Sequence, residues 1–176
     1  VLDGVGDHLL DADSFSICAG DVFVIDEQHS HGYHDTRDLH IANVLFDEAY
    51  LGSRAPSLVT VPGYQAFVHL EPRSRRRLEF EGRLRLSPER MTEVRATVSR
   101  LAGELEEQRD GYVAAATALL VQLIVGICRA YTESESEAHR DLLDIGRVIG
   151  YIENHYAEPI QLEDLQELVA MSERSL

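Results

Sequence analysis

Residues 145–176 read IGRVIGYIENHYAEPIQLEDLQELVAMSERSL, which is a pattern of helix, break, helix and tight turn. The first helix should end before Pro159, because the residue that precedes a proline avoids the helical conformation. Residues 160–169 form the next short helix, and Ser172 is a natural N-cap for a third. This order is typical of a helix-turn-helix, whose second helix enters the major groove of DNA. We expect that helix to begin at Glu173 and to be cut off in its first turn.

Ser172, Arg174 and Ser175 are the candidate DNA-binding residues, because they lie at the N-terminus of that helix. Such positions contact phosphates and base edges. The alternative is an ordinary capped helix on an acidic surface. The formal charge of the chain is −15, whereas DNA-binding surfaces are normally basic. We therefore expect weak or absent DNA binding by this chain, as part of a longer protein that does bind DNA.

Composition places the chain among ordinary globular proteins, with 44% hydrophobic residues. Cys18 and Cys128 each lie in an apolar run, which favours reduced, buried thiols in the cytoplasm over a disulfide framework. The apolar run from Tyr112 to Cys128 is shorter than the ~20 residues that span a bilayer. It indicates a buried core or interface helix, and we expect no membrane association.

The first half of the chain predicts strands and the second half helices, so the fold class is α+β. Strand signals favour a barrel or sandwich over residues 1–86, with Pro62-Gly63 as a turn between two strands. The predicted strands are 15–18, 22–25, 39–46, 58–61, 64–70 and 78–86.

Two helices should follow, because Ser87 and Pro88 suit a helix start and Gly111 interrupts the pattern. They are expected to fold back as a helical hairpin over residues 87–131. The first helix has an a/d pattern that would pack either on the second helix or on another subunit. Its residues are Met91, Val94, Val98, Leu101 and Leu105. A polar, acidic linker is predicted over residues 132–141, before a helical unit at 142–176.

Three segments together resemble the AraC-type bacterial transcription regulators, and the rhamnose-type regulators in particular. Residues 151–165 (YIENHYAEPIQLEDL) with 171–176 (MSERSL) are similar to the first of that family's two helix-turn-helix units. Residues 20–25 (GDVFVI), 31–33 (HGY) and 43–46 (NVLF) resemble the second half of its cupin barrel. Residues 86–88 (LSP), 111–112 (GY) and 129–131 (RAY) resemble its helical linker.

The resemblance implies a partial cupin-like barrel at residues 1–86 that binds a small-molecule effector, such as a sugar or another small polar metabolite. It also implies a homodimer formed through the hairpin. The candidate effector-binding residues are His31, Tyr33, His40 and Asn43, whose polar groups suit a hydroxyl-rich ligand. The alternative is that these residues only close one end of the barrel. Residue by residue, the resemblance extends to His31 alone.

The function expected from these features is a ligand-responsive, DNA-binding regulator that is not an enzyme and has no cofactor, metal or catalytic residues. A competing hypothesis is a metal-dependent cupin enzyme, such as an isomerase or a dioxygenase. It is motivated by the closely spaced His29, His31 and His34, since histidine is the commonest metal ligand. A bare dimerisation module is a further alternative.

Overall fold

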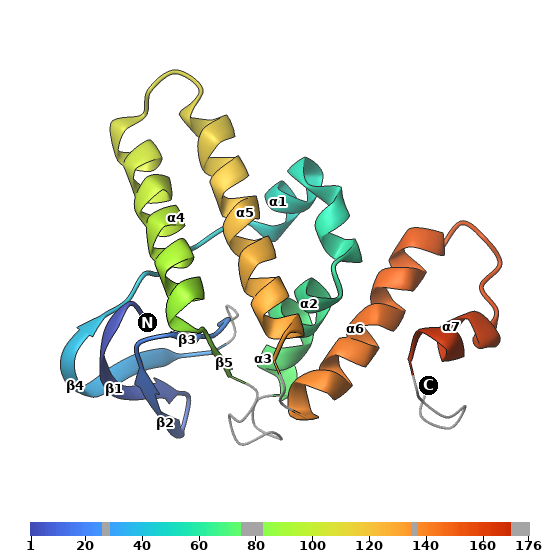
Figure 1. Ribbon diagram of the computed structural model, residues 1–176, viewed down its shortest axis with the longest axis horizontal. Coiled ribbons are helices and arrows are strands. Elements are labelled where there is room, and N and C mark those ends of the chain that lie inside the picture. Colours follow the sequence, from blue (N-terminus) through green and yellow to red (C-terminus); the bar gives the residue numbers. More distant parts are fainter. Residues whose placement is uncertain (26–28, 75–82, 135–136, 170–176) are drawn as a thin grey trace.

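The computed structural model describes residues 1–25, 29–74, 83–134 and 137–169. A small sheet region lies at one end, an upright helical hairpin rises beside it, and shorter helices lie between that hairpin and the C-terminal helices (Figure 1). The mixed α+β class expected from the sequence is confirmed.

The larger sheet has three antiparallel strands in the order β2-β1-β4. They are β1 (Asp3–Leu10), β2 (Asp13–Cys18) and β4 (His31–His40). A second sheet pairs β3 (Asp21–Val22) with β5 (Leu84–Arg85). Both sheets are open, and the described strands do not close into a barrel.

A buried carboxylate joins the two sheets. Asp21 is fully buried, and its Oδ2 accepts a hydrogen bond of 2.8 Å from the backbone N–H of Cys18. Its Oδ1 accepts one of 2.8 Å from Nε of Arg85, on β5. The strand that precedes the helical hairpin is thereby fixed to the end of β2.

Several predicted strands are wrong or shifted. Residues 58–61 and 64–70 are helical, within η1 (Pro56–Thr60, a 3₁₀-helix), α2 (Pro62–Tyr64) and η2 (Gln65–Leu70, a π-helix). The predicted strand at 39–46 is displaced, because β4 ends at His40 and residues 41–47 are irregular. Only the first residue of the predicted strand 22–25 is in a strand, and residues 78–82 lie outside the described residues.

In the helical segment between the sheet and the hairpin, two prolines lie at helix starts, where their fixed backbone angle favours helix formation. Pro56 and Pro62 take first-turn positions, where no backbone N–H is needed. Tyr64, Ala66 and Phe67 are buried within it. The remaining helices of this segment are α1 (Glu48–Arg54), which Asp47 caps, and α3 (Glu71–Ser74).

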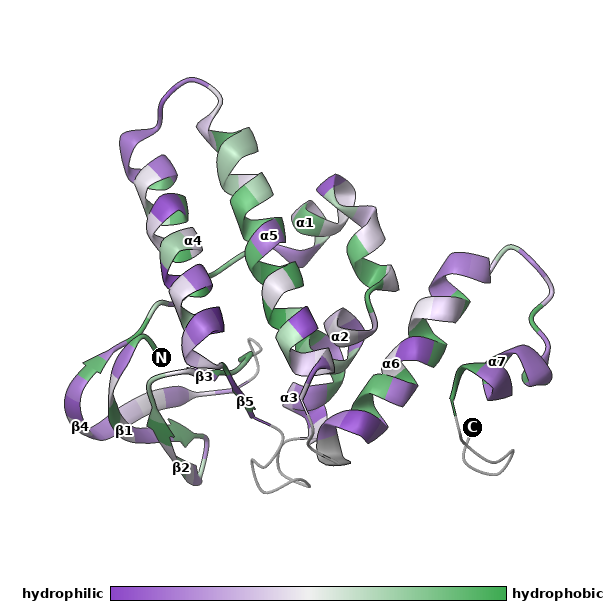
Figure 2. Cartoon of the chain, in the orientation of Figure 1, coloured by the Kyte–Doolittle hydropathy of each residue, from purple (hydrophilic) through white to green (hydrophobic). Residues whose placement is uncertain are grey.

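The predicted hairpin is confirmed as α4 (Pro88–Glu107) and α5 (Tyr112–Thr132), with Ser87 as the N-cap of α4. By length and composition, α5 could also cross a membrane. In this structure it packs against α4, α2 and α1. Figure 2 shows that α5 is apolar over most of its surface, whereas α4 is largely polar.

The two C-terminal helices are α6 (Glu137–His155) and α7 (Leu162–Leu168), so part of the predicted linker is helical. The apolar face that the sequence predicts for this helix is only partly buried: it consists of Leu142, Ile145, Ile149, Ile152 and Tyr156. Leu142 is 6% exposed and belongs to the core, whereas Ile145, Ile152 and Tyr156 are 41%, 39% and 78% exposed. The buried face presents Leu143, Gly146 and Gly150 together with Leu142. Small residues on this face allow α6 to approach its neighbours closely.

Helix α2 packs between α5 and α6 so closely that backbone atoms of neighbouring helices are almost in contact. A Cβ atom at Gly63 would lie 2.4 Å from the carbonyl oxygen of Cys128, on α5. A Cβ atom at Gly146, on α6, would lie 2.7 Å from the carbonyl oxygen of Pro62. Glycine is therefore required at both crossings, because any Cβ would force the helices apart.

We predict that Gly146→Ala lowers the free energy of unfolding by about 1–3 kcal/mol, the usual cost of overpacking. The matched control is Gly103→Ala, on α4, where an added Cβ would meet no described atom within 4 Å. That control should raise stability by up to about 1 kcal/mol, because alanine is the better helix former. Urea unfolding followed by circular dichroism measures both changes. Equal effects of the two substitutions would contradict the crossing.

Candidate functional site

The inner face of the larger sheet carries a cluster of rings. Strand alternation in β1 turns His8 and Leu10 toward the interior, and Asp7 and Leu9 toward the opposite face. The His8 ring is fully buried and stacks on Phe23, at 4.5 Å between ring centroids.

Two predicted effector residues complete this cluster. Tyr33 stacks on His8 at 5.2 Å, and His31 meets the His8 ring edge-on at 6.0 Å. We call His8, Phe23, His31 and Tyr33 the ring cluster. It joins β1 and β4 with the segment that follows β3.

The chemistry of the ring cluster suits a ligand that has both a flat face and hydroxyl groups. The Tyr33 hydroxyl is buried and has no hydrogen-bond partner among the residues that the structure describes. Burial raises the pKa of Tyr33, so the phenol stays protonated and can donate. A buried hydroxyl without a partner costs about 1–3 kcal/mol, which a ligand oxygen would recover.

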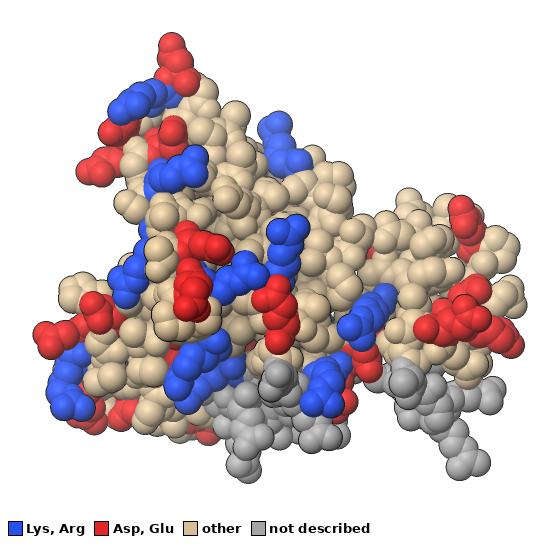
Figure 3. Space-filling view, in the orientation of Figure 1, with Lys and Arg blue, Asp and Glu red and all other residues tan. Residues whose placement is uncertain are grey.

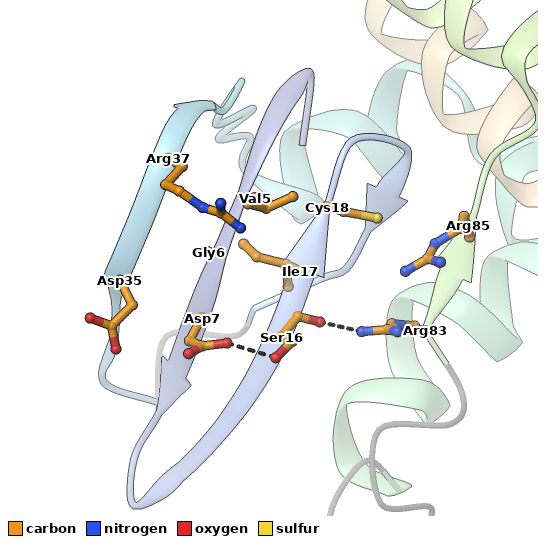
Figure 4. A pocket seen from close by; sticks show the side chains of 10 residues that line it. All are labelled: Val5, Gly6, Asp7, Ser16, Ile17, Cys18, Asp35, Arg37, Arg83 and Arg85. Carbon is orange, nitrogen blue, oxygen red and sulfur yellow. Dashed lines mark hydrogen bonds between the residues drawn. The ribbon is translucent and has the colours of Figure 1, made fainter.

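The outer face of the same sheet has an open groove of about 420 Å³ (Figure 4). Ser16 donates a hydrogen bond of 2.7 Å to Asp7, and Arg83 donates to the carbonyl oxygen of Ser16. Three arginines and two aspartates line the groove with smaller side chains. Its residues are Val5, Gly6, Asp7, Ser16, Ile17, Cys18, Asp35, Arg37, Arg83 and Arg85.

The other two predicted effector residues lie away from the ring cluster. His40 is at the opposite end of β4, is exposed, and its Nδ1 lies 3.0 Å from the carbonyl oxygen of Asp38. Asn43 is exposed in the irregular segment after β4. The structure thus brings together His31 and Tyr33, but not His40 and Asn43.

Sequence reasoning missed His8 and Phe23 as neighbours of His31. The available signal was a single histidine on the apolar face of an alternating strand. That pattern is also typical of a histidine with a purely structural role in the core. The pairing of His8 with Tyr33 across the sheet, which places it beside a predicted effector residue, is visible only in the structure.

The predicted dimerisation residues are used largely within the chain. Met91 and Val94 pack against the core cluster that includes Leu86 and Tyr131. Leu101 is buried with Ala116 and Leu119 of α5. Val98 is half-buried, and Leu105 is 52% exposed near the turn that joins α4 to α5.

The predicted DNA-binding residues Ser172, Arg174 and Ser175 lie outside the described residues. The preceding helices are described, and α6 contacts α7. Glu163 and Asp164 are in the first turn of α7, and Figure 3 shows acidic side chains gathered at the end of the molecule that holds this helix.

Comparison with known proteins gives no matching protein-family model and no significantly similar solved structure. Curated relatives do match, over 173 residues or 98% of the chain. One is the HTH-type transcriptional activator RhaS of Pectobacterium atrosepticum, at 22% identity. The RhaS proteins of Pectobacterium carotovorum subsp. carotovorum and Escherichia fergusonii are 20% and 25% identical.

The chain resembles RhaS activators along nearly its whole length. This confirms the similarity to AraC-type regulators, inferred from separate segments of the sequence. The chain spans 58% of the length of these RhaS relatives.

The two cysteines should differ sharply in reactivity, since Cys18 lines the groove and Cys128 is fully buried. Burial raises the pKa of Cys128 to about 12, so almost no thiolate is present near neutrality. We predict that DTNB at pH 8 labels one thiol per chain rapidly and the second only in denaturant. Cys18→Ser should remove the rapid phase, and Cys128→Ser should leave it intact. Rapid labelling of Cys18→Ser would contradict the assignment.

Proposed function

We propose that the chain is the sensor and dimerisation part of a ligand-responsive, DNA-binding transcription regulator that works in the cytoplasm. The observation that carries the proposal is the similarity to RhaS activators over 98% of the chain. The two sheets would then be part of a cupin-like barrel, and α6 and α7 the first helices of a helix-turn-helix.

The proposed effector is a sugar or a related polar metabolite that binds at the ring cluster. Aromatic faces pack on the apolar face of a sugar ring, while convergent polar groups fix its hydroxyls. His31 and Tyr33 are the proposed contacts, with His8 and Phe23 as the stacking surface. His40 and Asn43 would belong to the site only if ligand binding rearranged the end of β4.

Dimerisation through the hairpin is the second part of the proposal. Because Met91, Val94 and Leu101 pack within the chain, the contact would use the surface that remains. Leu105 and Val113 are 52% and 50% exposed on either side of the turn between α4 and α5. A second hairpin that packs there would cover this apolar surface.

Regulation would follow from a population shift and would involve no bond chemistry. A ligand changes the arrangement of sensor and DNA-binding helices only as far as its affinity differs between the two arrangements. The competing hypothesis of a metal-dependent cupin enzyme is not favoured, because the relatives named above are transcriptional activators.

Effector binding is tested by isothermal titration with a panel of pentoses, hexoses and their deoxy forms. We predict that at least one binds, and that His31→Ala and Tyr33→Phe each weaken its binding tenfold or more. His40→Ala is the matched control and should bind normally, because His40 lies outside the ring cluster. A panel without any binder, or one whose binding depends on His40 alone, would contradict this part of the proposal.

DNA binding by this chain alone should be weak. Residues 145–176 contain two arginines against six acidic side chains, which leaves a formal charge of −4. We expect a Kd above about 1 µM at physiological salt, the range of non-specific binding. Selection from a random duplex pool, followed by fluorescence anisotropy, measures it. Sub-micromolar, sequence-specific binding would refute the prediction.

A further inference from the structure

Three metal-ligating side chains converge on the outer face of the sheet, opposite the ring cluster. Asp7 on β1 pairs with His34 on β4 across the strands. Asp35 follows with φ 48°, a left-handed conformation that interrupts the strand alternation. One ligand atom from each of the three side chains lies within 4.8 Å of the other two.

The surrounding hydroxyls position two of these side chains. Ser16 donates a hydrogen bond to Asp7, at 2.7 Å. Ser14 Oγ lies 3.1 Å from Nε2 of His34, at the nitrogen opposite the one that faces Asp35. Metal-bound histidines commonly hold their second ring nitrogen in such a hydrogen bond, which fixes the tautomer and the ring orientation. Nδ1 of His34 lies 2.8 Å from Oδ2 of Asp35, and a metal ion bound by both atoms would replace this direct contact.

The groove supplies room for further ligands. Asp7 and Asp35 both line its wall, so a cation held between them would face an open cavity of about 420 Å³. Arg37 lines the same groove, without an ion-pair partner among the described residues. Its positive charge would oppose a bare cation, and would attract an anionic ligand bound to that cation.

We propose that Asp7, His34 and Asp35 form a site for a divalent transition metal on the outer face of the sheet. One imidazole nitrogen and two carboxylate oxygens are a donor set for Zn²⁺, Mn²⁺, Co²⁺ or Ni²⁺. The metal would join β1 to β4, with open coordination positions toward the groove. This differs from the expectation of no metal, and also from a site built by His29, His31 and His34, since only His34 takes part.

Co²⁺ is the probe for the test, because it is paramagnetic and accepts these ligands. Titration of the chain with CoCl₂ should give one bound ion per chain. In ¹⁵N-resolved NMR spectra, broadening should centre on residues 5–9 and 33–36. His34→Ala and Asp35→Asn should each weaken binding tenfold or more. Asparagine tolerates the left-handed conformation at position 35, so this variant should keep the fold.

His40→Ala is the matched control, since it removes another exposed histidine of β4 and should leave Co²⁺ affinity unchanged. Arg37→Gln should strengthen binding severalfold by removing the opposing charge. The proposal is overturned if no ion binds at millimolar Co²⁺, if His34→Ala binds normally, or if broadening centres on His29, His31 or His69. Two further measurements distinguish this site from the ring cluster. His31→Ala should still bind Co²⁺, and His34→Ala should still bind the sugar.

Discussion

The close approach of α2 to both α5 and α6 is the constraint on which the helical half of the molecule depends. Gly63 meets the backbone of α5, and Gly146 of α6 meets the backbone of α2. Two core clusters share this region: one includes Phe67, Tyr131 and Leu143, and the other Leu51 and Tyr64. Interiors are close-packed, so widening either crossing would open both clusters. Gly146 therefore sets how closely α6 can approach α2.

This constraint also explains where sequence reasoning failed. Pro62-Gly63 is a turn dipeptide by composition, and short apolar runs on either side of it suggest strands. In the folded chain the proline starts a helix, and the glycine is needed for a helix crossing. Long periodic segments such as residues 88–107 were predictable, because apolar residues that recur every three or four positions over such a length indicate only a helix. The buried face of α6 was predictable only in part, because Leu142 joins the core as expected while Gly146, rather than the isoleucines, makes the close contact with α2.

The candidate site was predictable in part for a similar reason. His31 and Tyr33 are two residues apart, so a strand places them on one face without any knowledge of the fold. His8 and Phe23 join them through strand pairing and a turn, which are long-range features. His40 was grouped with His31 by proximity in sequence, although a ten-residue strand separates its ends widely. The outer-face groove depends on Arg83 and Arg85 reaching the sheet from a distant segment.

The two faces of the sheet are coupled because the same strands form both. Asp7 and His8 are neighbours on β1, as Tyr33 and His34 are on β4, so a ligand on either face bears on the same strand pair. The sheet in turn touches the hairpin: Arg95 of α4 donates to the carbonyl oxygen of Leu2, and Leu86 N–H donates to that of Gly20. A shift of β1 against β4 therefore has a direct physical connection to the start of α4. A ligand would change the position of the hairpin through this connection only if it bound one arrangement of the hairpin more tightly than another. Equal affinity for the two arrangements would leave their populations unchanged.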